Sequence, residues 1–201
     1  MQRIRRAILS CHDKTGIVEL ARLLSEFEVE IISTSGTLKV LQEAGIGAIS
    51  ISEFTGVPEL MDGRVKSLHH KVHAGLLGVR ENKVHLEQLQ AHGFGWIDLV
   101  VANLHPLNEI VARPQITADE VFEQTDIGGV AMIRSAAKNF RYVTVAVNPG
   151  KYPQIMHEMR AHDGAVSYAM RFRLAQEAFE CTAEYDRILA AYFQRTGPPA
   201  E

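Results

Sequence analysis

Cysteine is scarce in this sequence, and its scarcity excludes two structural classes. Among 201 residues only Cys11 and Cys181 occur, far apart and in no paired-spacing motif. A disulfide framework or a cysteine-based zinc site needs more cysteines at closer spacing, so neither is expected. Two isolated thiols suit a reducing cytoplasm, which is the location we expect.

Long apolar runs and a strong net charge are also missing. Only Ala7–Leu9 is apolar after the basic N-terminus, which is too short for a signal-peptide core, and no stretch approaches a membrane span. The 21 Lys and Arg residues nearly balance 24 Asp and Glu, so the formal charge is −3. We therefore expect neither nucleic acid nor a membrane as a partner, because backbone or headgroup neutralisation needs a basic face.

What the sequence does contain is an alternation of strand and helix patterns, without repeats or low-complexity segments. Apolar runs at 6–10, 29–33, 97–104 and 142–147 predict strands buried between helices, as in a parallel sheet. The segment 17–27 predicts a helix, because its apolar residues fall on one helical stripe. Between these lie a predicted turn at 34–37, a helix at 38–45 and a strand at 46–51.

The second half of the chain is predicted to be mainly helical. Thr117 and Glu120 have the spacing of a capping box, 126–139 begins a second helix, and the chain is almost entirely helical beyond Pro149. The expected fold class is α/β, a three-layer, mostly parallel sheet with a C-terminal helical extension. We expect one domain over 1–201, divided into a core at 1–150, the helical extension at 151–195 and a tail at 196–201.

Three segments could form a ligand site. Two of them directly follow predicted strands, where ligands of open α/β sheets bind beyond the carboxyl ends, and the third lies between the last two predicted strands. Two of them combine hydroxyls with a lysine or a glycine, as a phosphate cradle would; these residues are Ser10, Lys14 and Thr15 in one, and Ser33, Thr34, Ser35, Gly36 and Thr37 in the other. Simple helix caps remain an equal alternative. Neither segment matches a Walker or dinucleotide fingerprint, which disfavours ATP or NAD chemistry.

The third segment, 126–139, combines an acid with glycines and a lysine. Asp126 stands beside Gly128 and Gly129, where the backbone can approach a ligand closely, and Lys138 follows on the same predicted helix. Such a group could orient an amide and stabilise a developing oxyanion. A capped surface helix with a charged face is the alternative.

The stretch 62–77 concentrates positive and titratable side chains. Arg64, Lys66 and Lys71 stand among three histidines, His69, His70 and His73, with no carboxylate from 64 to 73. A metal site is disfavoured, since the cations would repel it and no His-Glu-x-x-His pattern occurs. The interspersed apolar residues fit a solvated surface poorly, so a pocket for an anionic substrate is the favoured interpretation.

Together, "SCHDKTGI", "DGRVKSLHHKVHAGLL", "IDLVVANLHP", "TDIGGVAMIRSAAKN" and "LAQEAFECTAEYD" resemble the IMP cyclohydrolase domain of the bifunctional AICAR transformylase/IMP cyclohydrolase family, in order over nearly the whole chain. The resemblance implies a methylglyoxal-synthase-like fold, a homodimer with active sites near the interface, and no metal or organic cofactor. It also implies ring closure of formyl-AICAR to IMP, a purine ribonucleotide. The transformylase portion is absent from these residues, which implies a stand-alone domain or a shortened chain, with a separate transformylase as a possible partner.

The resemblance also implies roles for individual residues. Lys66, His105, Asp126 and Lys138 would be catalytic. Substrate would be bound by Ser10, His12, Lys14, Thr15, Thr34, Ser35, Gly36, Thr37, Arg64, Ser67, Asn103, Ile127, Gly128 and Gly129.

Two positions of these motifs depart from the family pattern in ways that bear on the chemistry. The family typically has tyrosine where this chain has His105, and serine where it has His12. Histidine can exchange a proton near neutral pH, so His105 could replace the phenol in kind. Two other functions stay open: a methylglyoxal-synthase-like lyase, although the Gly-Asp-Pro segment of that family is absent, and a non-catalytic module that binds a purine nucleotide or phosphate.

Overall fold

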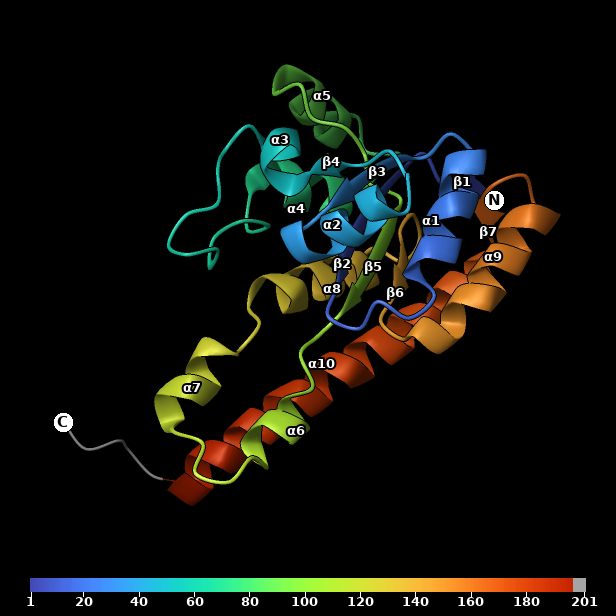
Figure 1. Ribbon diagram of the computed structural model, residues 1–201. Coiled ribbons are helices and arrows are strands. Elements are labelled where there is room, and N and C mark those ends of the chain that lie inside the picture. The colour runs from blue at the N-terminus through green and yellow to red at the C-terminus, as the bar shows by residue number, and fades with distance from the viewer. Residues whose placement is uncertain (197–201) are drawn as a thin grey trace.

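Five short strands form a parallel sheet at the centre of the computed structural model, which describes residues 1–196 (Figure 1). Their order across the sheet is β4-β3-β2-β5-β6. The strands are β2 (Arg6–Cys11), β3 (Glu30–Ser33), β4 (Ile49–Ser50), β5 (Leu99–Asn103) and β6 (Thr144–Ala146). A separate antiparallel pair joins β1 (Gln2–Arg3) to β7 (Ala165–Val166).

Helices cover both faces of the sheet, as the apolar strands require. They are α1 (Ile17–Glu26), α2 (Ser35–Glu43), α3 (Ile51–Thr55), α4 (His70–Leu77), α5 (Lys83–Ala91), α6 (Leu107–Val111), α7 (Ala118–Glu123), α8 (Gly128–Lys138), η1 (Pro149–Lys151), α9 (Tyr152–Ala161) and α10 (Tyr168–Thr196). Apolar residues of α1, α2 and α9 pack on one face, and those of α3, α4 and α8 on the other. Alternate residues of β2, such as Leu9 and Ile8, point into the two cores.

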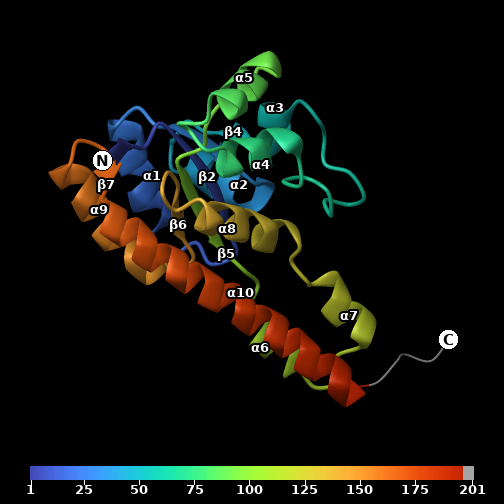
Figure 2. The same cartoon turned by 180° about the vertical axis from the view of Figure 1, so that it is seen from behind.

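Helix α10 is the longest element and crosses the whole molecule (Figures 1 and 2). Its first half adds Leu174 to one core and Ala178 to the other. Its second half extends past the sheet, where Tyr185 and Tyr192 pack with α6 and α7 in a third apolar cluster. We call this part, α6, α7 and the end of α10, the arm.

The sequence predicted the three-layer α/β fold, and the structure confirms it. The predicted helix at 17–27 forms as α1, with Ile17, Leu20 and Leu24 fully buried. The predicted capping box at Thr117 starts α7, with side-chain and backbone bonds in both directions. No helix within residues 1–196 is long and apolar enough to cross a membrane.

Two local predictions at the edge of the sheet were wrong. The turn predicted at 34–37 is already the first turn of α2, capped by the extended Thr34. The strand predicted at 46–51 is reduced to β4, because Ser50 caps α3 and accepts a hydrogen bond from the backbone N–H of Glu53. Thr196, the first residue of the predicted tail, still belongs to α10; the rest of the predicted tail, 197–201, lies outside the described residues.

Candidate active site

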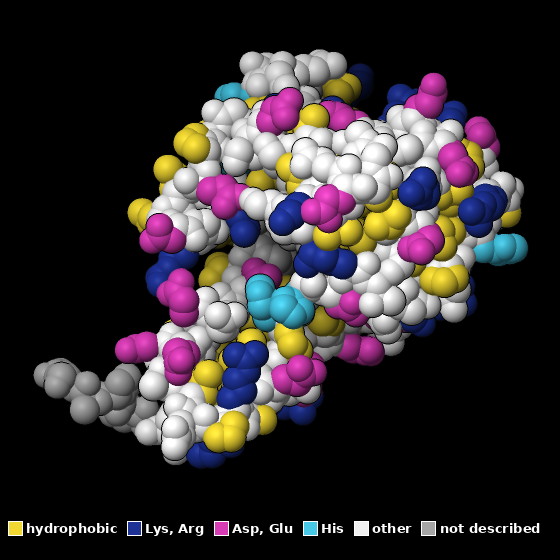
Figure 3. All heavy atoms as spheres, in the orientation of Figure 1, with side chains coloured by type: hydrophobic (Ala, Val, Ile, Leu, Met, Phe, Trp, Pro, Cys, Tyr) yellow, Lys and Arg dark blue, Asp and Glu magenta, His cyan; other side chains and the backbone are white. Residues whose placement is uncertain are grey.

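A cleft of about 580 Å³ opens at the carboxyl edge of the sheet. It lies between the ends of β2, β3 and β5, the loop at 62–67, and the turn that leads into α8. Phe122, Leu189 and Phe193 of the arm close its outer side. Figure 3 shows the hollow between the core and the arm, with histidine and Lys or Arg side chains at its border.

Hydroxyl groups line the end of the cleft between β2 and β3. The Thr34 hydroxyl donates to Ser10 Oγ (3.1 Å), and the Cys11 backbone N–H donates to Thr37 Oγ1 (2.9 Å). Lys14 curls back over its own loop, where its ammonium donates to the carbonyl of His12 (3.0 Å). Hydroxyls, a lysine and the start of α2 thus converge on one spot, as an anion such as phosphate requires.

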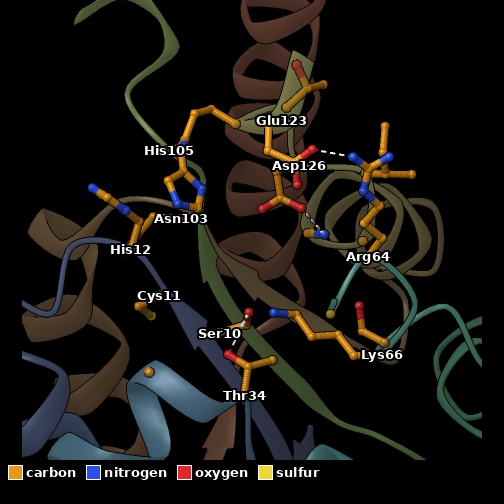
Figure 4. A pocket seen from close by; sticks show the side chains of 18 of the residues that line it. Ser10, Cys11, His12, Thr34, Arg64, Lys66, Asn103, His105, Glu123 and Asp126 are labelled. Carbon is orange, nitrogen blue, oxygen red and sulfur yellow. Dashed lines mark hydrogen bonds and ion pairs between the residues drawn. The ribbon is translucent and has the colours of Figure 1, made fainter. Parts of the chain in front are cut away.

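One lysine and one arginine line the cleft on the opposite side. The loop at 62–67 carries both, and the Lys66 side chain extends across the cleft toward Ser10 and Thr34 (Figure 4). Arg64 instead pairs with Glu123 at the end of α7, which links the loop to the arm at the mouth of the cleft. Within residues 1–196 Lys66 forms no ion pair, so its charge is available to a bound anion.

Asp126 lies just before α8. Its side chain both lines the cleft and accepts a hydrogen bond from the first turn of the helix. One carboxylate oxygen accepts a hydrogen bond from the Gly129 N–H (2.7 Å), which caps the helix. A Cβ on Gly129 would lie 2.5 Å from the other oxygen, and one on Gly128 would lie 2.5 Å from Ser67 Oγ. Both glycines are therefore needed for the backbone to pass this close to the cleft.

His105 stands between Asp126 and the β2 loop. Its imidazole is half-buried, and its buried Nδ1 atom has no hydrogen-bond partner within residues 1–196. Burial lowers the pKa of His105, and the nearby charges of His12, Lys66 and Lys14 lower it further, against the opposite effect of Asp126. The ring is therefore held in its neutral form through the neutral pH range, where it can accept a proton.

Fifteen of the 18 residues predicted for the site line this cleft. They are Ser10, His12, Lys14, Thr34, Gly36, Thr37, Arg64, Lys66, Ser67, Asn103, His105, Asp126, Ile127, Gly128 and Gly129. The other three, Thr15, Ser35 and Lys138, do not line the cleft. The Thr15 hydroxyl donates to Asp13, and the Ser35 hydroxyl donates to Glu59.

Lys138 is the third residue outside the cleft, and the expectation that it joins the other groups fails within a single chain. It is the last residue of α8, whose 11 residues begin at the cleft. At 1.5 Å per residue the helix places Lys138 about 15 Å away, at its opposite end. The side chain is exposed there.

The histidines of the stretch 62–77 also lie outside the cleft. His69 caps α4 by accepting a hydrogen bond from the Lys71 N–H, and His73 pairs with Ser135 on α8. Lys71 donates to the Phe54 carbonyl. Of this stretch, the first part, which includes Arg64, Lys66 and Ser67, lines the cleft, while the remainder anchors α4.

Sequence reasoning missed the arm and one core residue. Phe122, Leu189 and Phe193 have no motif that would mark them, because only the packing of α7 against α10 brings them to the cleft. Cys11 forms part of the floor, and burial raises the pKa of its thiol, so it stays protonated. Among the described residues, no group of three His, Cys, Asp or Glu side chains is arranged to hold a metal ion.

The sequence is similar to those of two protein families and to individual known proteins. Residues 16–131 match the family described as "MGS-like domain", and 136–201 match "AICARFT/IMPCHase bienzyme". The chain is 53% identical over 189 residues to the "Bifunctional purine biosynthesis protein PurH" of Chlorobium chlorochromatii, and 46% identical over 192 residues to that of Neisseria meningitidis. It spans 36% of the length of each, while 94% and 96% of this chain are covered.

A solved structure, "Crystal structure of ForH", superposes with a TM-score of 0.84 at 33% identity, covering 94% of this chain and 99% of that one. The MGS-like match alone spans more than half of the sequence, and the second match begins after a gap of four residues. The chain therefore belongs to the MGS-like domain family.

Proposed function

We propose that this chain is an IMP cyclohydrolase, which closes the second ring of formyl-AICAR to give IMP and water. One observation carries the proposal: a single cleft joins a hydroxyl-lined anion site to Lys66, His105 and Asp126. This arrangement occurs in a chain that matches the AICARFT/IMPCHase family and is 53% identical to a purine biosynthesis protein.

The cleft meets the physical demands of this reaction. The hydroxyls of Ser10, Thr34 and Thr37 would hold the ribonucleotide phosphate, which fixes the distance to the reacting atoms. Asp126 would orient the carboxamide, and the ammonium of Lys66 would stabilise negative charge on the formyl oxygen. His105, already neutral, would accept a proton.

In the chemical step, the carboxamide nitrogen forms a bond to the formyl carbon and gives up one proton. The formyl oxygen becomes a hydroxyl, and the formamide nitrogen then gives up its proton as a C=N bond forms. The oxygen leaves with both protons as water, so no oxidant, reductant or cofactor is consumed. His105 would carry a proton from nitrogen to oxygen in this sequence.

Lys138 enters this proposal through a second copy of the chain. Since it lies outside the cleft of its own chain, it could act on the substrate only from the partner in a homodimer. A separate transformylase would supply formyl-AICAR, and a cytoplasmic location would fit both enzymes.

The test is an assay of the purified protein against formyl-AICAR, with IMP measured by chromatography and a sample without protein as the control. We expect IMP to form well above the uncatalysed rate. Binding of IMP without turnover would support a sensor instead, and release of methylglyoxal from dihydroxyacetone phosphate would support a lyase. Either of those results in place of turnover would overturn the proposal.

A further inference from the structure

Two histidines lie against each other on one wall of the cleft. The ring centroids of His12 and His105 are 4.4 Å apart, with 48° between the ring planes. Both residues line the cleft, and Figure 4 shows the two rings next to Asn103. His12 is exposed, whereas His105 is half-buried. These are also two positions at which the chain departs from the pattern of the family that it resembles.

The contact is fixed by the ends of two neighbouring strands. Asn103, the last residue of β5, accepts a hydrogen bond from the Asp13 N–H through its side-chain oxygen (2.7 Å) and donates to the Asp13 carbonyl (2.8 Å). Its own carbonyl accepts from the His12 N–H (3.3 Å). The segments that carry His12 and His105 are thus joined by three hydrogen bonds within two residues of the rings, which hold the two backbones side by side.

The charged groups around His105 act mostly in one direction. His12 and Lys14 face it from the β2 loop and Lys66 from the loop at 62–67, and positive charge on any of these side chains opposes a proton on the ring and lowers its pKa. Asp126, from the start of α8, is the one group among these neighbours that favours the proton. Burial opposes protonation of His105 most strongly, and among the neighbouring side chains His12 lowers its pKa the most.

We propose that His12 is a positioning residue for His105, which packs against its imidazole and keeps it neutral and ready to accept a proton from the substrate. The role of His105 in the reaction rests on the proposed function, but the interaction of the two rings does not. Two imidazolium charges at this separation repel each other, and the contact also shields His105 from water.

The first test is an NMR titration of the histidine rings, with the His105 signal assigned by its loss in His105→Tyr. We expect the pKa of His105 to rise in His12→Ser, because the lowering effect of His12 and its shielding are removed, and to rise further in His12→Asp, which adds a negative charge. The control His157→Ser, which changes an exposed histidine of α9, should leave the pKa of His105 unchanged. An unchanged His105 titration in both His12 variants would overturn the proposal.

The second test is the pH dependence of kcat/KM for formyl-AICAR. The acid limb reports protonation of His105, so in His12→Ser it should move to higher pH by the same amount as the NMR titration. It should disappear in His105→Tyr. A limb that stays in place while the titration moves would refute the link to the reaction. If the protein does not turn over formyl-AICAR at all, the proposed function fails, while the NMR result still decides whether His12 controls His105.

Discussion

At the scale of single residues, the two lysines of the cleft differ in how much of their charge is available. The ammonium of Lys14 donates to the carbonyls of Cys11 (3.3 Å) and His12 (3.0 Å), so it is already held by its own loop. Lys66 extends freely across the cleft. We therefore assign the larger contribution to transition-state stabilisation to Lys66, because a charge without a protein partner interacts more strongly with a substrate anion.

Replacing Lys66 by methionine should lower kcat/KM for ring closure by about a hundredfold to a thousandfold, the cost typical of removing one such donor. The side chains are similar in length, so the fold should be unaffected. Steady-state assays on formyl-AICAR measure the effect. Lys83→Met, on the exposed start of α5, removes the same charge elsewhere and should retain normal activity. Equal activity of Lys66→Met and the wild type would contradict the role of Lys66.

At the scale of elements, the start of α8 combines a structural and a chemical task. The Asp126 carboxylate caps the helix through the Gly129 N–H, and the same carboxylate lines the cleft. The backbone N–H of Asp126 donates to Tyr185 Oη (2.8 Å), which ties this turn to α10. A helix cap of this kind is read easily from sequence, but its position next to a substrate is not.

Two substitutions separate these tasks. Asp126→Asn keeps an oxygen that can accept the Gly129 hydrogen bond, so thermal and urea unfolding should change little, while turnover should fall because the negative charge is lost. Asp126→Ala should lose the cap as well, at about 1 kcal/mol of unfolding free energy. If the asparagine variant kept full activity, Asp126 would be a cap alone.

The elements also show why some sequence predictions failed. Apolar strands such as β5 were predicted correctly, since burial on both faces leaves a continuous apolar run. The segment 46–51 has a similar run, yet only two residues pair there, because β4 is an edge strand and Ser50 caps the helix that follows. Whether an apolar run continues as a strand depends on its neighbour in the sheet, which the local sequence does not specify.

At the scale of the whole molecule, Lys138 connects the site to oligomeric state. It is exposed at the end of α8 remote from its own cleft, so the catalytic role implied by the resemblance requires a second subunit. Most homo-oligomers are two-fold symmetric dimers, in which each subunit can complete the site of the other.

Mixing of two inactive variants tests this arrangement. If Lys66 and Lys138 act on one substrate from different subunits, Lys66→Met and Lys138→Met mixed after reversible dissociation should regain roughly a quarter of wild-type activity, because half of the random dimers contain one intact site. Sedimentation should show a dimer in both cases. Absence of recovery from well-mixed dimers would show that Lys138 does not act across the interface, and full activity of Lys138→Met alone would show that it does not act at all.

The sequence by itself determined the α/β fold class, the helix starts at Ile17 and Thr117, and 15 residues of the cleft. Strand burial and helix capping are local properties of the sequence, and the motifs after β2, β3 and β5 meet because parallel strands share one carboxyl edge. The loop at 62–67 and the turn before α8 follow the helices α3 and α7, so this rule does not place them. Only the tertiary structure decided the rest: the aromatic wall from the arm, the contact of His12 with His105, and the exclusion of Lys138. The first two depend on distances between segments remote in sequence, set by how α10 packs and by where neighbouring strands end, and no local pattern encodes such a distance. The third depends on the length of α8, which separates Lys138 from the cleft.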